Sequence, residues 1–134
     1  MYTTPDLRNY GGADAYLSTC PSRKVLEVLA NKWTALLIPA LRRAPMRFGE
    51  LRRRLDGITQ KSLTQALRTL ERDGLVTRTQ QLTIPPRVDY ALTDLGREAA
   101  ELLDGLHLWA EHNLAAVLEA RTSYDARVAT STAS

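Results

Sequence analysis

The chain has 134 residues, of which 44% are hydrophobic and 25% charged, a composition typical of one globular domain with a single core. It lacks a basic start followed by an apolar run, and it lacks an apolar segment long enough for a membrane span. We therefore expect a cytoplasmic protein without membrane partners. A single cysteine, Cys20, leaves no internal disulfide and no basis for a Cys-rich zinc site.

The charge is unevenly distributed along the chain. Residues 42–87 contain eleven Lys and Arg against four Asp and Glu, a net charge of +7, whereas the remainder carries −4. A basic middle segment between acidic ends favours a surface that binds a polyanion, above all nucleic acid.

The first half of the chain predicts an arm followed by helices. Residues 1–20 lack sustained periodicity and are expected to form an N-terminal arm. From Pro21, apolar residues at helical spacing predict two core helices separated at Asn31, with a kink at Pro39 in the second. Phe48, Leu51 and the residues after them predict a third helix, which the Asp56-Gly57 pair ends.

A fourth helix, a strand pair and a final helix complete the predicted domain, residues 21–121. Thr59 is placed to cap the fourth helix and Gly74 to end it, and the short turn at Asp56-Gly57 joins the third helix to the fourth. Alternation predicts antiparallel strands over 75–79 and 87–92, with a protruding loop that contains Pro85-Pro86. A long amphipathic helix then begins at Thr93, and the Ser/Thr/Ala-rich residues 122–134 are expected to be a disordered tail.

The outer face of the fourth helix has the side chains that a helix in a DNA major groove needs. Positions opposite the leucine stripe are cationic or hydrogen-bonding, and Arg pairs with guanine while Gln pairs with adenine. Any surface helix has a polar outer face, so this face alone does not indicate DNA binding. Here, however, an Arg-rich helix precedes the helix and a wing with Arg87 at its base follows it, and this arrangement favours DNA binding. The predicted DNA-binding residues are Arg52, Arg53, Lys61, Ser62, Thr64, Gln65, Arg68, Arg72 and Arg87.

Several ordered blocks at fitting spacings resemble the HxlR-type regulators, from Cys20 to about Trp109. The blocks are Cys20-Pro21, Asn31-Lys32-Trp33-Thr34, Arg47-Phe48-Gly49-Glu50-Leu51, Gly57-Ile58-Thr59-Gln60-Lys61, Leu63-Thr64-Gln65, Leu67-Arg68, Leu70-Glu71, Asp73-Gly74-Leu75-Val76, Pro85-Pro86-Arg87-Val88-Asp89-Tyr90 and Leu92-Thr93 with Gly96. Two positions depart from the family's pattern. Asn31 stands where a glycine is usual, and Pro39 stands where a helix-compatible residue is more common.

The resemblance implies a mainly α fold with a small two-stranded β wing, a winged helix-turn-helix whose terminal helices form a dimer interface. It implies a homodimer on double-stranded operator DNA, with a recognition helix from Thr59 to Asp73. The apolar residues of the last helix are too many for a core this small, which also favours self-association. We expect the interface at Leu102, Leu106, Trp109 and Val117.

Cys20 is the expected site for sensing oxidants or electrophiles. It precedes Pro21, a residue favoured at the first helical position, so the thiol is expected at a helix N-terminus that favours thiolate. Some HxlR-type relatives sense quinones, aldehydes or oxidants at this position. The alternative is that Cys20 only packs and that a non-covalent small molecule or a metal controls the regulator.

Three other functions were weighed against DNA binding. A Cys20 nucleophile with His107 or His112 lacks a third orienting residue, so we expect no catalytic site. A metal sensor would gather acidic residues and histidines on the last helix, where they more often flank a dimer interface, so we expect no metal and no cofactor. A protein-binding winged helix would have an acidic or apolar outer face, and this face is basic. The candidate metal residues are Asp104, His107, Glu111 and His112.

Overall fold

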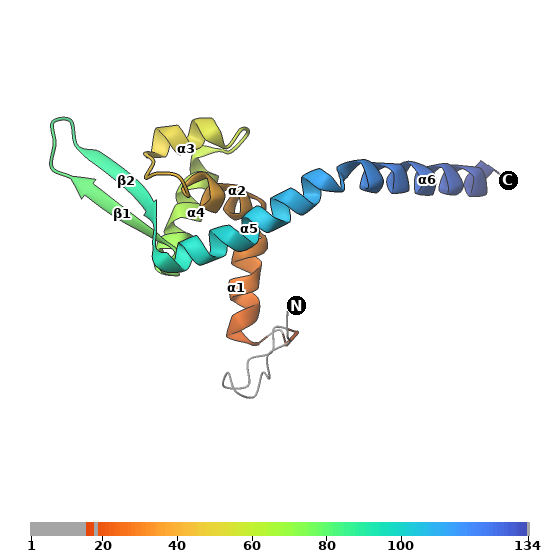
Figure 1. Ribbon diagram of the computed structural model, residues 1–134, viewed down its shortest axis with the longest axis horizontal. Coiled ribbons are helices and arrows are strands. Elements are labelled where there is room, and N and C mark those ends of the chain that lie inside the picture. The colour runs from red at the N-terminus through yellow and green to blue at the C-terminus, as the bar shows by residue number, and fades with distance from the viewer. Residues whose placement is uncertain (1–15, 18, 134) are drawn as a thin grey trace.

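The computed structural model describes residues 16, 17 and 19–133, in which helices surround a small core and a two-stranded wing projects from it (Figure 1). The predicted arm lies largely outside these residues. The elements are α1 (Pro21–Ala30), α2 (Lys32–Ala40), α3 (Phe48–Arg54), α4 (Gln60–Arg72), β1 (Val76–Gln81), β2 (Arg87–Leu92), α5 (Asp94–His112) and α6 (Leu114–Ala133).

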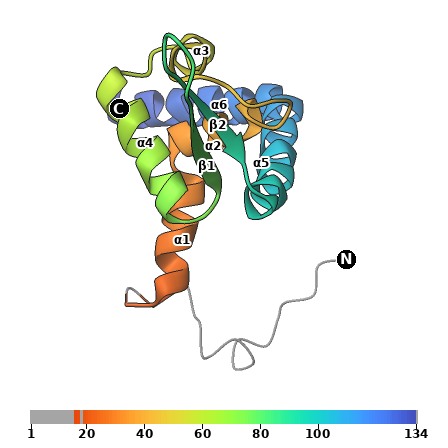
Figure 2. The same ribbon diagram turned by 90° about the vertical axis from the view of Figure 1, so that its left-hand side faces the viewer.

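The core lies where α2, α3, α4 and the first half of α5 meet the base of the wing. α4 contributes one side of its surface, on which leucines recur at helical spacing, and α2 packs against α5. Figure 2 shows α4 and α5 on opposite sides of α2. The fully or almost fully buried side chains include Leu37, Ile38, Leu51, Leu63, Leu67, Leu70, Val76, Leu92, Ala100 and Leu103.

Asn31 is the N-cap of α2, a role that the sequence analysis did not assign. Its Oδ1 accepts hydrogen bonds from the backbone N–H groups of Trp33 at 2.9 Å and Thr34 at 3.3 Å. Asn satisfies the free donors of a first helical turn well, so its presence in place of glycine is stabilising here. Pro39 lies in the last turn of α2, and the helix ends at Ala40 instead of running on through the predicted kink.

Two glycines with positive φ define the turns around α4. Gly57 has a φ of +86° between α3 and α4, and Gly74 has a φ of +76° between α4 and β1. Side chains rarely adopt this region, whereas glycine adopts it without a steric cost. The strands pair antiparallel from Val76 opposite Leu92 to Gln81 opposite Arg87, so the first strand begins and ends slightly later than predicted.

The C-terminal part of the chain differs from the prediction in two ways. The expected single long helix is divided at Asn113, whose side-chain amide donates to the carbonyl oxygen of Trp109 at 2.9 Å. The predicted disordered tail is wrong for residues 122–133, because α6 continues to Ala133. No Gly or Pro interrupts residues 114–133, and hydroxyls such as those of Thr122 and Thr130 bond back to the carbonyl four residues earlier.

α1 was predicted as a core helix, and this is only partly correct. None of its residues is fully buried, and Val25 and Leu26 are more than half exposed. The helix extends away from the body, while α5 and α6 extend from another side as a long arm (Figure 1). Val28 and Leu29 pack against the core, whereas Val25 and Leu26 face outward in the single chain.

Candidate nucleic-acid interface

α4 is held by a cap at its start and by leucines along one side. The Thr59 hydroxyl oxygen accepts a hydrogen bond from the Ser62 N–H at 3.0 Å, as the sequence predicts. Leu63, Leu67 and Leu70 are buried against the core. Because these anchors fix the rotation of the helix about its axis, the opposite side chains must face outward.

The outer face of α4 brings together most of the predicted DNA-binding residues. Gln60, Lys61, Thr64, Gln65 and Arg68 line one hollow of about 620 Å³ on this face. Arg72 is exposed in the last turn of the helix, and no salt bridge joins it, Arg68 or Lys61 to any residue that the structure describes. These cations are thus available to an external anion.

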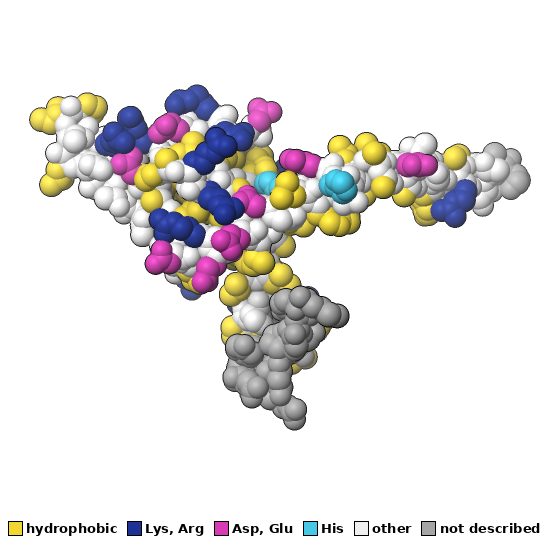
Figure 3. All heavy atoms as spheres, viewed as in Figure 1, with side chains coloured by type: hydrophobic (Ala, Val, Ile, Leu, Met, Phe, Trp, Pro, Cys, Tyr) yellow, Lys and Arg dark blue, Asp and Glu magenta, His cyan; other side chains and the backbone are white. Residues whose placement is uncertain are grey.

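α3 adds a second cationic group beside α4. Arg52 and Arg53, together with Arg54, form the last turn of α3 and are exposed. Cations at a helix C-terminus are favoured by the helix dipole, so this placement is stable without a carboxylate partner. In the view of Figure 3, Lys and Arg side chains gather over the body of the molecule near α3, whereas the α5–α6 arm presents many hydrophobic side chains.

Arg87 lies at the loop end of the wing, whereas the sequence analysis placed it at the base. Its Nε donates to Asp89 Oδ1 at 3.0 Å, and the Gln81 side-chain amide donates to Asp89 Oδ2 at 3.1 Å. The hydrogen bond from Arg87, with a smaller contribution from Gln81, holds the pKa of Asp89 below its ordinary value, against the opposing effect of burial. Asp89 therefore stays ionised near neutral pH and offsets part of the charge of Arg87.

A groove between α4 and the wing contains residues that the sequence analysis did not select. Arg78 on β1 lies opposite Tyr90 on β2 in the strand register. Both line this groove of about 540 Å³ together with Gln60 and Arg68 from α4. Only the packing of the wing against α4 shows that Arg78 turns toward this helix.

Cys20 occupies the N-cap position of α1, with Pro21 as the first helical residue, as the sequence predicts. The thiol is 8% exposed, and its Sγ lies 3.1 Å from the Ser22 hydroxyl oxygen. The Arg23 backbone N–H donates to the Cys20 carbonyl oxygen at 3.1 Å. The geometry at the helix start is the expected one, and Cys20 is buried in the single chain.

The predicted dimer residues are exposed to different degrees. Leu102, Leu106 and Trp109 on α5 are 71%, 54% and 60% exposed, and Val117 on α6 is half-buried. Further apolar side chains, among them Leu114, Leu118 and Tyr124, are exposed along α6. Such large exposed side chains on one arm are unusual for a chain that stays monomeric.

The metal site that was weighed as an alternative has no geometry to support it in the described part of the chain. Among residues 16, 17 and 19–133, no group of three His, Cys, Asp or Glu side chains is arranged to hold a metal ion. Asp104, one of the candidate ligands, instead forms an ion pair with Arg42 at the end of α2. No helix in this part of the chain is long and apolar enough to cross a membrane.

Comparison with known proteins gives one consistent result. The family model described as HxlR-like helix-turn-helix matches residues 28–117. The HTH-type transcriptional regulator YtfH of Escherichia coli K12 is 41% identical over 106 residues, which cover 79% of this chain and 84% of the relative.

Solved structures agree with this match. The transcriptional regulator YtfH from Salmonella typhimurium superposes with a TM-score of 0.78 at 38% identity, covering 82% of this chain and 98% of that one. The redox regulator HypR in its oxidized form superposes with a TM-score of 0.66 at 38% identity, covering 70% of this chain and 97% of that one.

Proposed function

Since the chain belongs to the HxlR-like helix-turn-helix family of DNA-binding transcriptional regulators, we propose that it binds a specific operator as a homodimer, with α4 in the major groove. The observation that carries this proposal is the outer face of α4, where unpaired cations and amides stand opposite a buried leucine side. A major groove admits one helix and presents donors and acceptors that such side chains recognise.

The residues divide into two roles by their chemistry and position. Gln65 and Arg68, at the centre of the outer face of α4, are assigned to base edges, since an amide pairs with adenine and a guanidinium with guanine. The remaining predicted residues lie elsewhere on α4, on α3 and on the wing, and they are assigned to the phosphates that flank the groove. They are Arg52, Arg53, Lys61, Ser62, Thr64, Arg72 and Arg87.

Homodimer formation is assigned to the exposed apolar side chains of α5, α6 and α1. The exposure of Leu102, Leu106, Trp109 and Val25 in the single chain supports this assignment. Two subunits related by a two-fold axis present two α4 helices in opposite directions, so the operator is expected to be an inverted repeat.

Selection from a pool of random DNA duplexes tests the dimer and its operator together. The selected sequences are expected to contain two inverted half-sites whose centres are about one helical turn, or a multiple of it, apart. Enrichment of a single half-site, or of no sequence, would contradict the proposal.

An oxidant switch at Cys20 is the regulatory part of the proposal. The N-cap position of the thiol supports it, as does similarity to the redox regulator HypR, solved in both oxidized and reduced forms. Because the chain has one cysteine, oxidation by diamide would join two Cys20 thiols of different subunits or molecules, with two electrons and two protons passing to diamide. A small thiol or an electrophile such as a quinone would instead form a mixed disulfide or an adduct.

A DNA-binding titration with diamide or benzoquinone, on wild type and Cys20→Ser, tests this switch. The wild type is expected to lose affinity for the operator while Cys20→Ser keeps it. If both proteins keep their affinity or lose it equally, Cys20 is structural. The low exposure of Cys20 in the single chain favours that second candidate, a regulator controlled by a non-covalent ligand.

A further inference from the structure

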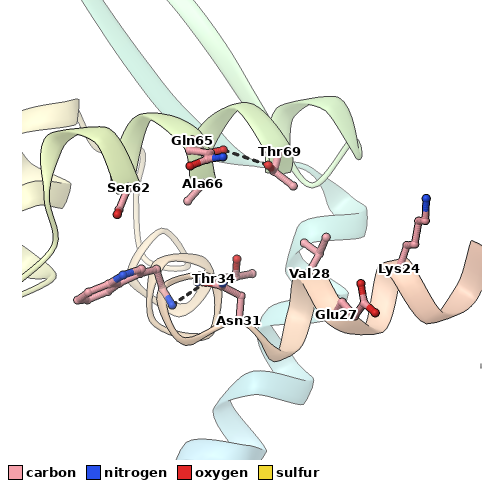
Figure 4. A pocket seen from close by; sticks show the side chains of 10 residues that line it. Lys24, Glu27, Val28, Asn31, Thr34, Ser62, Gln65, Ala66 and Thr69 are labelled. Atoms are coloured by element: carbon pink, nitrogen blue, oxygen red, sulfur yellow. Dashed lines mark hydrogen bonds between the residues drawn. The ribbon is translucent and has the colours of Figure 1, made fainter. Parts of the chain in front are cut away.

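A cavity of about 480 Å³ lies along the flank of α4 that faces α1 and α2 (Figure 4). It runs along α4 from Ser62 to Thr69, a distance of about 10 Å at the rise of an α-helix. Its size is in the range of small-molecule sites. The residues that line it are Lys24, Glu27, Val28, Asn31, Trp33, Thr34, Ser62, Gln65, Ala66 and Thr69.

One end of the cavity is aromatic. Trp33 is half-buried, and its indole edge reaches to within 3.9 Å of the position that a Cβ on Gly57 would take, close to the start of α4. The Lys32 ammonium lies 4.4 Å from the ring centroid of Trp33. Val28 and Ala66 add apolar surface between the helices. A flat apolar group would therefore find contacts here on more than one side.

The other end carries a cation without a counter-ion. Lys24 reaches up from α1 near the Thr69 end of α4 (Figure 4). The neighbouring carboxylate, Glu27, lies 3.8 Å from Arg23 Nε, and no salt bridge joins Lys24 to any residue in the described part of the chain. The charge of Lys24 is thus left for an anionic ligand.

We propose that this cavity binds a planar aromatic carboxylate, with its ring system beside Trp33 and its carboxylate near Lys24. Hydroxyl and amide groups of Ser62, Gln65 and Thr69 line the α4 wall and offer hydrogen bonds along the ligand. This inference rests on the proposed DNA-binding function for its consequence, because it assigns the site of a non-covalent effector.

Gln65 connects the cavity to DNA binding. It is the residue common to the lining of this cavity and to that of the hollow on the outer face of α4. Its backbone carbonyl oxygen accepts a hydrogen bond from the Thr69 hydroxyl at 3.0 Å, and this bond does not involve the Gln65 side-chain amide. A ligand that engages the Gln65 amide withdraws it from a base, and the affinity for the operator falls.

Calorimetric titration of the full chain with 2-naphthoate, in the absence of DNA, tests the site. Lys24→Gln is expected to weaken binding of 2-naphthoate about five- to tenfold, since it removes one charge-assisted contact near the surface. Uncharged 2-naphthalenemethanol should bind both proteins equally. Lys61→Gln removes an equivalent charge on the other side of α4 and should leave both affinities unchanged.

A second variant and a second measurement complete the test. Ala66→Leu fills the cavity and should abolish binding of both compounds, while circular dichroism shows that the fold is kept. Saturating 2-naphthoate should also weaken operator binding by wild type and not by Ala66→Leu.

Three outcomes would overturn the inference: no binding to wild type, equal binding of 2-naphthoate to wild type and Lys24→Gln, or ligand binding without any change in DNA affinity. The calorimetric titration contains no DNA, so it measures ligand binding separately from DNA binding. A wild type that binds 2-naphthoate but no DNA would therefore contradict the proposed function and not the ligand site.

Discussion

Gln65 and Arg68 are the side chains on the outer face of α4 whose chemistry best distinguishes one base from another. Both line the same surface hollow, and Arg68 forms no salt bridge with a described residue. Arg87 differs, because its guanidinium already pairs with the ionised Asp89 on the wing. A side chain that is already paired within the protein contributes less to recognition of the base sequence than one that is free to form hydrogen bonds with a base.

Substitutions at these three residues should therefore have different effects. Gln65→Ala or Arg68→Ala is expected to change the preferred sequence, at a cost of roughly 1 to 3 kcal/mol at the affected base pair. Arg87→Ala should lower affinity by a similar factor on every sequence. Competition binding with a set of single-base operator variants measures this, and identical preferences for wild type, Gln65→Ala and Arg68→Ala would rule out the assigned face.

Individual caps and turns were predictable from local sequence, whereas contacts between elements were not. Thr59 and Gly74 have the predicted roles because a cap and a positive φ depend on neighbours in the chain. The position of Arg87 at the loop end and the turn of Arg78 toward α4 depend on register and packing. The contacts of these side chains form only when the wing packs against α4, so the local sequence does not predict them.

At the scale of the element, α5 begins in close contact with the base of the wing. The Thr93 hydroxyl accepts from the Gly96 N–H at 3.0 Å and donates to the Gly74 carbonyl oxygen at 2.6 Å. A Cβ on Gly96 would lie 2.1 Å from the carbonyl oxygen of Leu75. Only glycine permits α5 to start this near the strand, and the position of this first turn sets the direction of the helix axis.

Gly96→Ala should therefore destabilise the fold by about 2 kcal/mol or more, because the clash is with backbone that cannot move freely. Gly49→Ala is the matched control, since its Cβ would meet only the end of the Arg53 side chain at 3.5 Å. Chemical denaturation of both variants measures the free energy of unfolding. A Gly96→Ala protein as stable as Gly49→Ala would show that α5 can shift without cost.

The helices at the two ends of the chain were harder to predict than those in the middle. α3 and α4 bury an apolar side in the chain itself, so periodicity located them. α1 has the same kind of pattern but leaves Val25 and Leu26 exposed, because the apolar side of α1 meets no other helix of the same chain along most of its length. Residues 122–133 have a composition typical of disorder, yet local backbone and hydroxyl hydrogen bonds form a helix.

At the scale of the whole molecule, exposed apolar side chains gather on the parts that extend from the body. Trp109 on α5, Leu26 on α1 and Tyr124 on α6 are all more than half exposed. The cations assigned to DNA binding lie on α3, α4 and the wing instead. This separation gives the molecule one surface suited to a second copy and another suited to DNA.

Trp109→Asp should convert the dimer to a monomer that binds the operator weakly, because a charge would be buried in the interface. Leu82→Asp makes the same kind of change at an apolar side chain on the wing loop that is 98% exposed, and it should leave the dimer intact. Sedimentation or light scattering gives the molecular mass of each. A dimeric Trp109→Asp protein would exclude this residue from the interface.

The most direct test of DNA binding by the cationic surface is a fluorescence-anisotropy titration of the promoter region next to the protein's own gene, repeated at increasing salt. With arginines and lysines from two subunits near phosphates, affinity should fall roughly a thousandfold or more between about 50 and 200 mM salt, through release of condensed counterions. A double variant, Gln65→Ala with Arg68→Ala, should lose its preference for this DNA but keep a steep salt dependence. Failure of the wild type to bind this DNA in preference to an unrelated duplex, or an affinity that does not change with salt, would contradict the assignment.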